Sequence, residues 1–294
     1  MTEIIVLEVG EARHTALTAG PDDGEVVLLV HGFPDTPQSF RHHISAFAAA
    51  GHRVVAPYSR GYEPSSFPRD GSFEIMDLAR DTIGFVDAIG AERVHLVGHD
   101  WGAATAFVAA TLAPERFASV TAIAVPHPAR FAAAVRRAPM QLAYSWYMTF
   151  FQLGPLARWG SRRNDYALWR WLWNRWSPAY RISDDDWAEH VATFAVAGVD
   201  SAMLAYYRHN TGPMKVLGLA KTEWNQMTTV PVRTLAVSGV DDRCIHTRMW
   251  DDGIVPDQFP AGVTIHRMEG VGHWLLLERP EETAELLLGW FSAG

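Results

Sequence analysis

Short apolar runs rich in β-branched residues alternate with stretches of helical periodicity, and this alternation constrains the fold most. Residues 26–30 (VVLLV) are apolar at every position and are bounded by turn residues. A strand that is apolar along its whole length is typical of a parallel sheet covered by helices on both faces. Such runs predict strands at residues 3–9, 12–19, 26–30, 53–56, 94–97, 120–125, 232–237 and 263–268. Helical patterns predict helices at 38–50, 73–89, 103–112 and 281–291.

The alternation stops at Pro128 and resumes near Val232. The pattern of residues 128–224 is helical, rich in arginine and aromatic residues, and without a convincing strand. Eight of the twelve tryptophans lie there: Trp146, Trp159, Trp169, Trp171, Trp173, Trp176, Trp187 and Trp224. An insertion that follows a strand end lies where open α/β sheets bind ligands. We therefore expect an α/β core of residues 1–127 and 225–294, interrupted by a helical cap of residues 128–224.

Composition excludes several classes of protein. Lysine and arginine number 25 and aspartate and glutamate 33, so the net charge of −8 argues against nucleic acid as a partner. The single cysteine, Cys244, cannot form an internal disulfide, and no Cys/His group has zinc spacing. Because the N-terminus lacks signal-peptide features and no long apolar window occurs, we expect a cytoplasmic chain without a membrane span. A homodimer is compatible with this composition.

The strongest chemical signal is the segment Gly98-His99-Asp100-Trp101-Gly102, between an expected strand and an expected helix. This pattern is typical of a strained turn, permitted by its glycines, that lifts the central side chain above the sheet. The turn usually carries serine, whereas here Asp100 occupies its place. A carboxylate is a nucleophile at neutral pH without help from a base, and its natural target is an electrophilic sp³ carbon. The competing interpretation is that Asp100 only caps the following helix.

The loop after the strand 26–30 is a candidate oxyanion hole. It reads His31-Gly32-Phe33-Pro34. Such a loop can aim the backbone N–H of Phe33 at the same point as the N–H of Trp101. On its own, this tetrapeptide is also compatible with an ordinary turn.

A candidate acid and a candidate base follow two later strands. The segment SGVDD after the strand 232–237 has the Gly-x-x-Asp arrangement of a triad acid, which points to Asp242, with Asp241 as the competing choice. His273 follows the strand 263–268 and lies beside a glycine. A lone aspartate or histidine is more often structural, but the chain order nucleophile, acid, histidine is the one expected of α/β hydrolases.

These residues give nearly the whole chain a resemblance to epoxide hydrolases of the α/β-hydrolase fold, the aspartate-nucleophile branch near the haloalkane dehalogenases. The resemblance implies that Asp100 is the nucleophile, Asp242 the charge-relay acid and His273 the base. It implies that Phe33 and Trp101 supply the oxyanion hole. The implied reaction opens a small apolar epoxide to a vicinal diol through an aspartyl-alkyl ester, which water then hydrolyses. Neither a metal nor an organic cofactor is implied.

The resemblance further implies two cap tyrosines that donate protons to the epoxide oxygen. Residues 145–152 (SWYMTFFQ) resemble the first of the two cap segments and place the family's tyrosine at Tyr147. Residues 206–210 (YYRHN) resemble the second, with Tyr207 the better match and Tyr206 the neighbour that could be confused with it. An alkoxide is too basic to leave without a general acid, which is the physical reason for phenols here. The competing interpretation of each tyrosine is aromatic packing.

The loop 60–66 departs from the family pattern at one position. In the loop 60–66 (RGYEPSS), Glu63 stands where the family often has glycine, and we expect this to affect loop shape rather than chemistry.

A haloalkane dehalogenase shares the aspartate and the following tryptophan, but a halide needs N–H donors, and the Phe33 side chain has none. A non-catalytic ligand receptor on the same scaffold commonly loses part of the catalytic set, which is complete here. The elbow lacks the serine of an esterase.

Overall fold

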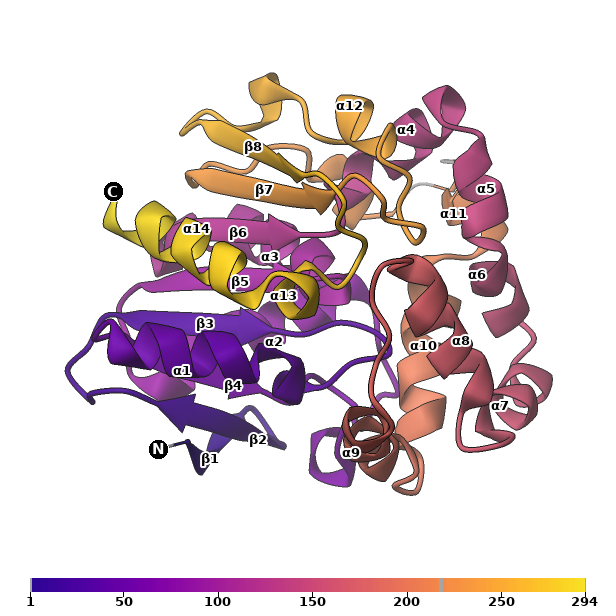
Figure 1. Cartoon of the computed structure of the whole chain (residues 1–294), viewed down its shortest axis with the longest axis horizontal. Coiled ribbons are helices and arrows are strands. Elements are labelled where there is room, and N and C mark those ends of the chain that lie inside the picture. Colours follow the sequence, from indigo (N-terminus) through magenta and orange to yellow (C-terminus); the bar gives the residue numbers. More distant parts are fainter. Residues whose placement is uncertain (1, 217–218, 221, 294) are drawn as a thin grey trace.

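The computed structural model describes residues 2–216, 219–220 and 222–293 (Figure 1). Within this part of the chain lies an eight-stranded sheet with the order β1-β2-β4-β3-β5-β6-β7-β8. The strands are β1 (Glu3–Val9), β2 (Ala12–Ala19), β3 (Val26–Val30), β4 (Arg53–Pro57), β5 (Val94–His99), β6 (Phe117–Ile123), β7 (Thr234–Gly239) and β8 (Val263–Met268). The helices of the core are α1 (Arg41–Ala49), α2 (Ile75–Ile89), α3 (Trp101–Leu112), α12 (Met249–Gly253), α13 (Leu275–Glu278) and α14 (Pro280–Ser292).

The sheet is mostly parallel, as the alternation predicts. Strands β3 to β8 pair in parallel, while β1 and β2 form an antiparallel hairpin and β2 runs antiparallel to β4. Every residue of β3 and β5 is buried, because each of these strands has a neighbour on both edges and helices on both faces. The expected α/β architecture is confirmed.

Two helical layers cover the sheet. Val27 and Leu29 of β3 pack in a cluster with residues of α1 and α14, whereas Leu28 and Val30 pack in a second cluster with residues of α2 and α3. This split follows from the two-residue period of a strand. In Figure 1, α1 and α14 lie in front of the sheet and α2 and α3 lie behind it. The carboxyl ends of the parallel strands all point to one side.

The cap consists of helices inserted between β6 and β7. They are α4 (Phe131–Arg137), α5 (Met140–Tyr144), α6 (Trp146–Phe151), α7 (Pro155–Arg162), α8 (Ala167–Trp176), α9 (Asp184–Phe194), α10 (Val199–Asn210) and α11 (Pro213–Val216). No strand occurs among the described residues of 128–224, as expected. Figure 1 places these helices beyond the carboxyl ends of the parallel strands. The ring of Trp173 on α8 stacks on Trp274 of the core with centroids 3.6 Å apart, so an aromatic contact joins the two layers.

The structure differs from the expected elements mainly at their ends. The helix expected from residue 38 begins with the 3-10 turn Pro37–Phe40, and the strand expected to reach Val125 ends at Ile123, because Ala124 has a φ of 66°. Helices α12 and α13 contain five and four residues, too few to show a helical period in the sequence. No helix in the described ranges has the length and apolar character needed to cross a bilayer.

Candidate active site

Asp100 occupies a sharp turn between β5 and α3. Its φ of 54° and ψ of −116° lie where residues other than glycine are rarely found. The flanking glycines allow this turn: a Cβ at Gly98 would lie 2.2 Å from the carbonyl oxygen of Gly102, and a Cβ at Gly102 would lie 2.0 Å from that of Val30. The Asp100 side chain makes no capping hydrogen bond to α3, which disfavours the purely structural interpretation. Backbone strain of this kind gathers at functional sites.

The Asp100 carboxylate is buried between two loops. Its Oδ1 accepts a hydrogen bond of 2.8 Å from the backbone N–H of Phe33, and its Oδ2 lies 3.5 Å from Nε2 of His273. Among the described residues, Phe33 is the one whose amide is hydrogen-bonded to this carboxylate. The Trp101 amide makes no such bond in this part of the chain, and the Trp101 ring packs edge-on to Tyr207 with centroids 5.3 Å apart. The structure thus brings Phe33 to Asp100 and leaves the Trp101 amide uncommitted.

His273 and Asp242 come from the loops after β8 and β7. The Nδ1 of His273 lies 2.9 Å from Oδ2 of Asp242, and both side chains are fully buried. Oδ1 of Asp242 accepts hydrogen bonds from the amides of Cys244 and Ile245 at 2.6 and 3.0 Å. Asp241 is exposed to solvent. Between the two candidate acids, the structure therefore places Asp242, and not Asp241, against the histidine.

The electrostatics of this trio favour a charged imidazole. Burial alone lowers the pKa of His273, but the Asp242 carboxylate and the hydrogen bonding and charge of Asp100 outweigh it and raise the pKa to about 10. The protonated ring therefore lies between two carboxylates. Because part of this rise comes from Asp100, any reaction that neutralises Asp100 lowers the pKa of His273.

Tyr147 on α6 and Tyr207 on α10 meet inside the protein. Both are buried, and their ring centroids lie 5.7 Å apart at 82°. Burial raises the pKa of each hydroxyl well above 10, and the negative charge of Asp100 raises it further. Both phenols are therefore protonated at neutral pH. The structure brings both sequence-predicted tyrosines to the cavity that holds Asp100.

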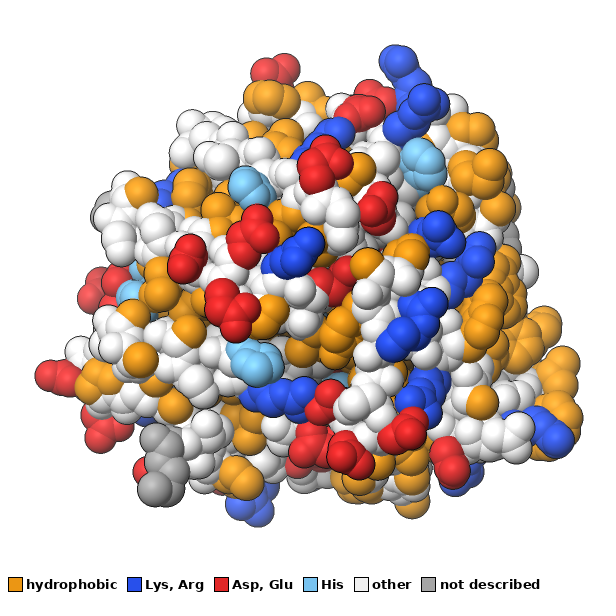
Figure 2. All heavy atoms as spheres, in the orientation of Figure 1, with side chains coloured by type: hydrophobic (Ala, Val, Ile, Leu, Met, Phe, Trp, Pro, Cys, Tyr) orange, Lys and Arg blue, Asp and Glu red, His pale blue; other side chains and the backbone are white. Residues whose placement is uncertain are grey.

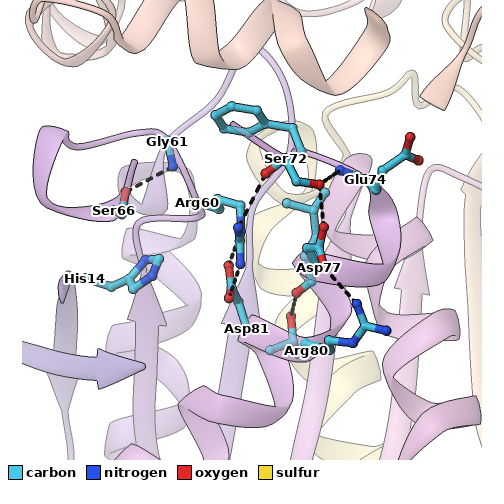
Figure 3. A network of polar contacts seen from close by, with 12 residues as sticks. His14, Arg60, Gly61, Ser66, Ser72, Glu74, Asp77, Arg80 and Asp81 are labelled. Atoms are coloured by element: carbon cyan, nitrogen blue, oxygen red, sulfur yellow. Dashed lines mark hydrogen bonds and ion pairs between the residues drawn. The ribbon is translucent and has the colours of Figure 1, made fainter. Parts of the chain in front are cut away.

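Tyr206 is held away from this cavity. Its hydroxyl donates a 2.6 Å hydrogen bond to the carbonyl oxygen of Arg60. The guanidinium of Arg60 makes two hydrogen bonds of 2.6 Å with the carboxylate of Asp81 and a third of 3.3 Å with the Ser72 carbonyl oxygen (Figure 3). Tyr206 thus anchors α10 to the core loop 58–72, and Tyr207 is the one free to face a ligand. Glu63 also belongs to this loop, where it accepts a hydrogen bond from an amide of β2.

A cavity of about 470 Å³ is shared by Asp100 and the two phenols of Tyr147 and Tyr207. Its lining includes Asp100, Trp101, Tyr147, Tyr207 and Cys244. Much of the remaining wall is apolar and comes from both layers: Ile75, Ala104, Val125, Pro128, Ala129, Phe131, Ala132, Ala133, Met148 and Ile245. A mostly apolar pocket with a few convergent polar groups is typical of a small-molecule site.

Cys244 is a cavity residue to which the sequence assigned no role. Its Sγ lies 3.4 Å from the hydroxyl of Tyr147, and burial with the charges of Asp242 and Asp100 raises the pKa of the thiol well above 9. The ligand atoms of Asp100, Cys244 and His273 lie within 4.8 Å of one another. A protonated imidazole and a neutral thiol are poor metal ligands, so these charges disfavour a metal centre. The position of Cys244, two residues beyond the candidate acid Asp242, was the feature of the sequence that could have placed it near the site.

A second buried acid–base pair, Asp35 and His99, contacts the backbone of His273. Nε2 of His99 donates a 3.0 Å hydrogen bond to the carbonyl oxygen of His273, and Nδ1 of His99 faces Oδ2 of Asp35 at 3.8 Å. Burial alone raises the pKa of Asp35, but the nearby histidines, His99 first, outweigh it and lower the pKa. Asp35 follows the Phe33 loop and His99 precedes Asp100. This pair therefore links the three loops that carry Asp100, Phe33 and His273.

Comparison with known proteins assigns the family. The family model described as alpha/beta hydrolase fold matches residues 25–280. The chain belongs to the alpha/beta hydrolase family. Among the proteins similar to this hydrolase, the AB hydrolase superfamily protein YfhM of Bacillus subtilis (strain 168) is 31% identical over 281 residues, which cover 95% of this chain and 94% of the relative.

Two further similarities of this hydrolase involve proteins named epoxide hydrolases, in agreement with the resemblance stated from the sequence. Epoxide hydrolase B of Mycobacterium tuberculosis is 45% identical over 123 residues, or 41% of this chain and 35% of the relative. That match therefore spans about a third of the relative's length. The crystal structure of Bacillus megaterium epoxide hydrolase in complex with an inhibitor superposes with a TM-score of 0.85 at 25% identity, covering 98% of this hydrolase and 100% of that chain.

Proposed function

We propose that this chain is an epoxide hydrolase that opens an apolar epoxide to a vicinal diol through a covalent ester on Asp100. The observation that carries the proposal is the sharing of one cavity by a carboxylate nucleophile and two buried phenols, Tyr147 and Tyr207. An epoxide requires both, because its carbon must be attacked while its oxygen receives a proton. The names of the Mycobacterium tuberculosis and Bacillus megaterium proteins support the same class.

In the first step, an Asp100 oxygen forms a bond to one epoxide carbon while the carbon–oxygen bond of the ring breaks. The electron pair of that bond goes to the ring oxygen, which takes a proton from Tyr147 or Tyr207. The negative charge of Asp100 is consumed as the ester forms. Because that charge helps to raise the pKa of both phenols, each becomes a stronger acid at the moment when its proton is needed.

In the second step, water hydrolyses the ester. Loss of the Asp100 charge lowers the pKa of His273, so the ring can give its proton to the phenolate and become a neutral base. His273 then takes a proton from water as the hydroxide attacks the ester carbonyl, and the amides of Phe33 and Trp101 stabilise the oxyanion. As this intermediate collapses, its bond to the diol oxygen breaks and that oxygen takes the proton of the newly added hydroxyl. This step releases the diol and restores the Asp100 carboxylate, while His273 keeps the proton that it took from water.

Other groups orient these residues. Asp242 holds the His273 ring through Nδ1 and stabilises its charge, in the manner of a triad acid. The buried pair of Asp35 and His99 is a positioning element that keeps the catalytic loops in register. We also propose that residues 1–127 and 225–294 form the catalytic core and residues 128–224 a cap that keeps bulk water from the cavity.

Trapping of the ester tests this proposal. In the variant His273→Gln the first step proceeds and hydrolysis is blocked. Incubation with styrene oxide is expected to add one substrate mass to the peptide that contains Asp100, as measured by mass spectrometry after proteolysis. The variant Asp100→Asn is the matched control and should remain unmodified. Binding of styrene oxide by His273→Gln without any adduct would contradict the proposal.

The rival functions give different results in activity assays. The Trp101 indole beside the nucleophile is the observation that favours a haloalkane dehalogenase, since such an N–H can bind a halide. That function predicts bromide release from bromoalkanes that is unaffected by Tyr147→Phe. A ligand receptor predicts epoxide or diol binding without turnover. The proposed hydrolase forms diol from an epoxide panel, leaves bromoalkanes intact and depends on the tyrosines.

A further inference from the structure

The charge of the chain is distributed unevenly. Residues 128–182 contain nine arginines and a single acidic residue, Asp165, although the whole chain has a net charge of −8. The rest of the chain accordingly holds sixteen basic and thirty-two acidic residues. Four of these arginines pair with carboxylates outside this range, namely Arg137, Arg158, Arg162 and Arg170. The other five still leave the first part of the cap with an excess of positive charge on an otherwise acidic protein, and such an excess favours an anionic partner.

The same region exposes large apolar side chains. We call this set the cap face: Met140, Leu142, Trp146, Leu153, Leu156, Trp159 and Trp171, each between 40 and 60% exposed. It contains every exposed tryptophan of the described residues. Figure 2 shows hydrophobic side chains along the outer edge of the cap, with lysine or arginine side chains beside them. An apolar area of this kind on a folded chain marks an interaction site.

Much of the cap face lies on the neighbouring helices α6, α7 and α8. The Trp146 ring on α6 lies 6.2 Å from that of Trp171 on α8. Leu156 and Trp159 lie three residues apart on α7, so they share one side of that helix, and Leu153 lies in the turn that precedes it. The guanidinium of Arg163 lies 4.8 Å from the Trp159 ring centroid. Cationic and apolar groups are thus interleaved on one surface.

A cationic hollow adjoins this surface. We call it the arginine hollow; it measures about 380 Å³ and is lined by Trp171, Asn174, Arg175, Pro178, Arg181 and Arg243. Arg181 is fixed by hydrogen bonds to the carbonyl oxygens of Tyr180 and Asn174 at 2.8 and 3.0 Å. Arg175 lies 5.4 Å from the ring centroid of Trp171. In the described part of the chain, none of these three guanidinium groups is paired with a carboxylate, so the hollow is suited to a phosphate group.

We propose that the cap face docks on an anionic lipid bilayer, with a lipid phosphate group in the arginine hollow. Tryptophans and leucines reach into the interfacial layer while the arginines contact the headgroups, an arrangement typical of peripheral membrane surfaces. A second copy of this chain presenting the same cationic face would be repelled. Nucleic acid would pair with the arginines but would leave the exposed leucines in water.

Docking would give the proposed hydrolase direct access to apolar substrate dissolved in the bilayer. Phe131 and Arg136 of α4 line the catalytic cavity, and Arg136 is exposed at the surface, so the cavity wall reaches the cap surface near α5. This benefit depends on the proposed function, whereas the docking itself does not. Vesicle binding is therefore measured without any substrate, and its failure is distinguishable from failure of the epoxide hydrolase proposal.

The test measures cosedimentation of the full chain with vesicles of phosphatidylglycerol and phosphatidylcholine, and with vesicles of phosphatidylcholine alone. We expect binding to the anionic vesicles only, weakened by added salt. Since each arginine near an anionic surface contributes about fivefold to binding, Arg175→Gln with Arg243→Gln should weaken it about 25-fold. The pair Leu156→Gln with Trp159→Gln should also weaken it, because it removes the inserted apolar groups.

Matched controls come from the core. Arg13→Gln with Arg69→Gln removes the same charge from exposed positions, and Ile4→Gln removes an exposed apolar side chain. These variants should bind as the unmodified chain does, and circular dichroism should show that all variants fold. Equal binding to both kinds of vesicle, or equal loss in the core variants, would overturn the proposal. So would vesicle-free dimerisation that Leu156→Gln with Trp159→Gln abolishes, or binding to duplex DNA that depends on Arg175 and Arg243 while anionic vesicles are ignored.

Discussion

The core and the cap contribute different chemistry and hold it by different means. The core supplies the charged groups Asp100, Asp242 and His273, each on a loop after its own parallel strand and each fixed by hydrogen bonds or charge pairing. The cap supplies the neutral hydroxyls of Tyr147 and Tyr207, which lie on helices and pack through ring contacts. In the proposed mechanism, the covalent chemistry therefore depends on groups fixed by the sheet, whereas the protons come from the helical layer packed on top of it.

The largest effect is expected from the core. Asp100→Asn replaces a carboxylate by an amide of the same shape that is a far weaker nucleophile. Diol formation in a steady-state assay should fall by about 10⁴-fold or more, as for other groups that act as a unit with a triad. Asp241→Asn, on the exposed neighbour of Asp242, is the control and should retain full activity. Substantial turnover by Asp100→Asn would show that the core does not provide the nucleophile.

Removal of both cap hydroxyls should have the next largest effect. The double variant Tyr147→Phe with Tyr207→Phe keeps the aromatic packing but loses general-acid help, so kcat for diol formation should fall by about 10³-fold. Either single variant should lose less, because the remaining phenol can still donate. Tyr206→Phe is the matched control, since its hydroxyl bonds the Arg60 carbonyl oxygen outside the cavity. If Tyr206→Phe were the more damaging change, the division of roles on α10 would be wrong.

A smaller effect, on stability, is expected when the stacked contact between the core and the cap is removed. Trp173 is fully buried, and its ring lies 3.6 Å from that of Trp274. Trp173→Ala should lower the free energy of unfolding, measured by urea denaturation, by about 3 kcal/mol. Trp159→Ala, on an exposed cap position, serves as the comparison and should change it by less than about 0.5 kcal/mol. Equal effects from the two variants would mean that the cap is not held by its aromatic contact with the core.

The smallest expected effect is a shift in the pKa of His273. Because two of the causes that raise the pKa of His273 to about 10 come from Asp100, Asp100→Asn should lower that pKa, as followed by the NMR signals of the ring. A pKa raised above 6.5 means that protonated His273 stabilises the fold below pH 6.5 and that this contribution is lost as the pH rises toward 10. In Asp100→Asn this contribution should be smaller, and its loss should be complete at a lower pH. An unchanged titration would show that the two residues are not electrostatically coupled.

The sequence predicts the elements and site residues of the core more completely than those of the cap. Strands such as 26–30 are apolar along their whole length, and the glycines around Asp100 mark a turn that only a narrow set of conformations satisfies. Contacts between residues far apart in the sequence are harder to predict: Cys244 lies beside Tyr147, 97 residues away, and Asp35, after β3, faces His99 at the end of the paired strand β5. In the cap, the choice between Tyr206 and Tyr207 depends on which side of α10 faces the core loop. Helical periodicity does not determine that rotation.

An isotope experiment tests the covalent role of Asp100 most directly. The protein, in excess over a racemic epoxide, is allowed a single turnover in water labelled with ¹⁸O, and the diol and the Asp100 peptide are analysed by mass spectrometry. In the proposed mechanism water attacks the ester carbonyl, so the first diol carries an oxygen from Asp100 and the label enters the Asp100 carboxylate. A labelled first-turnover diol with an unlabelled Asp100 would mean that water attacks the epoxide directly, and would contradict a covalent role of Asp100.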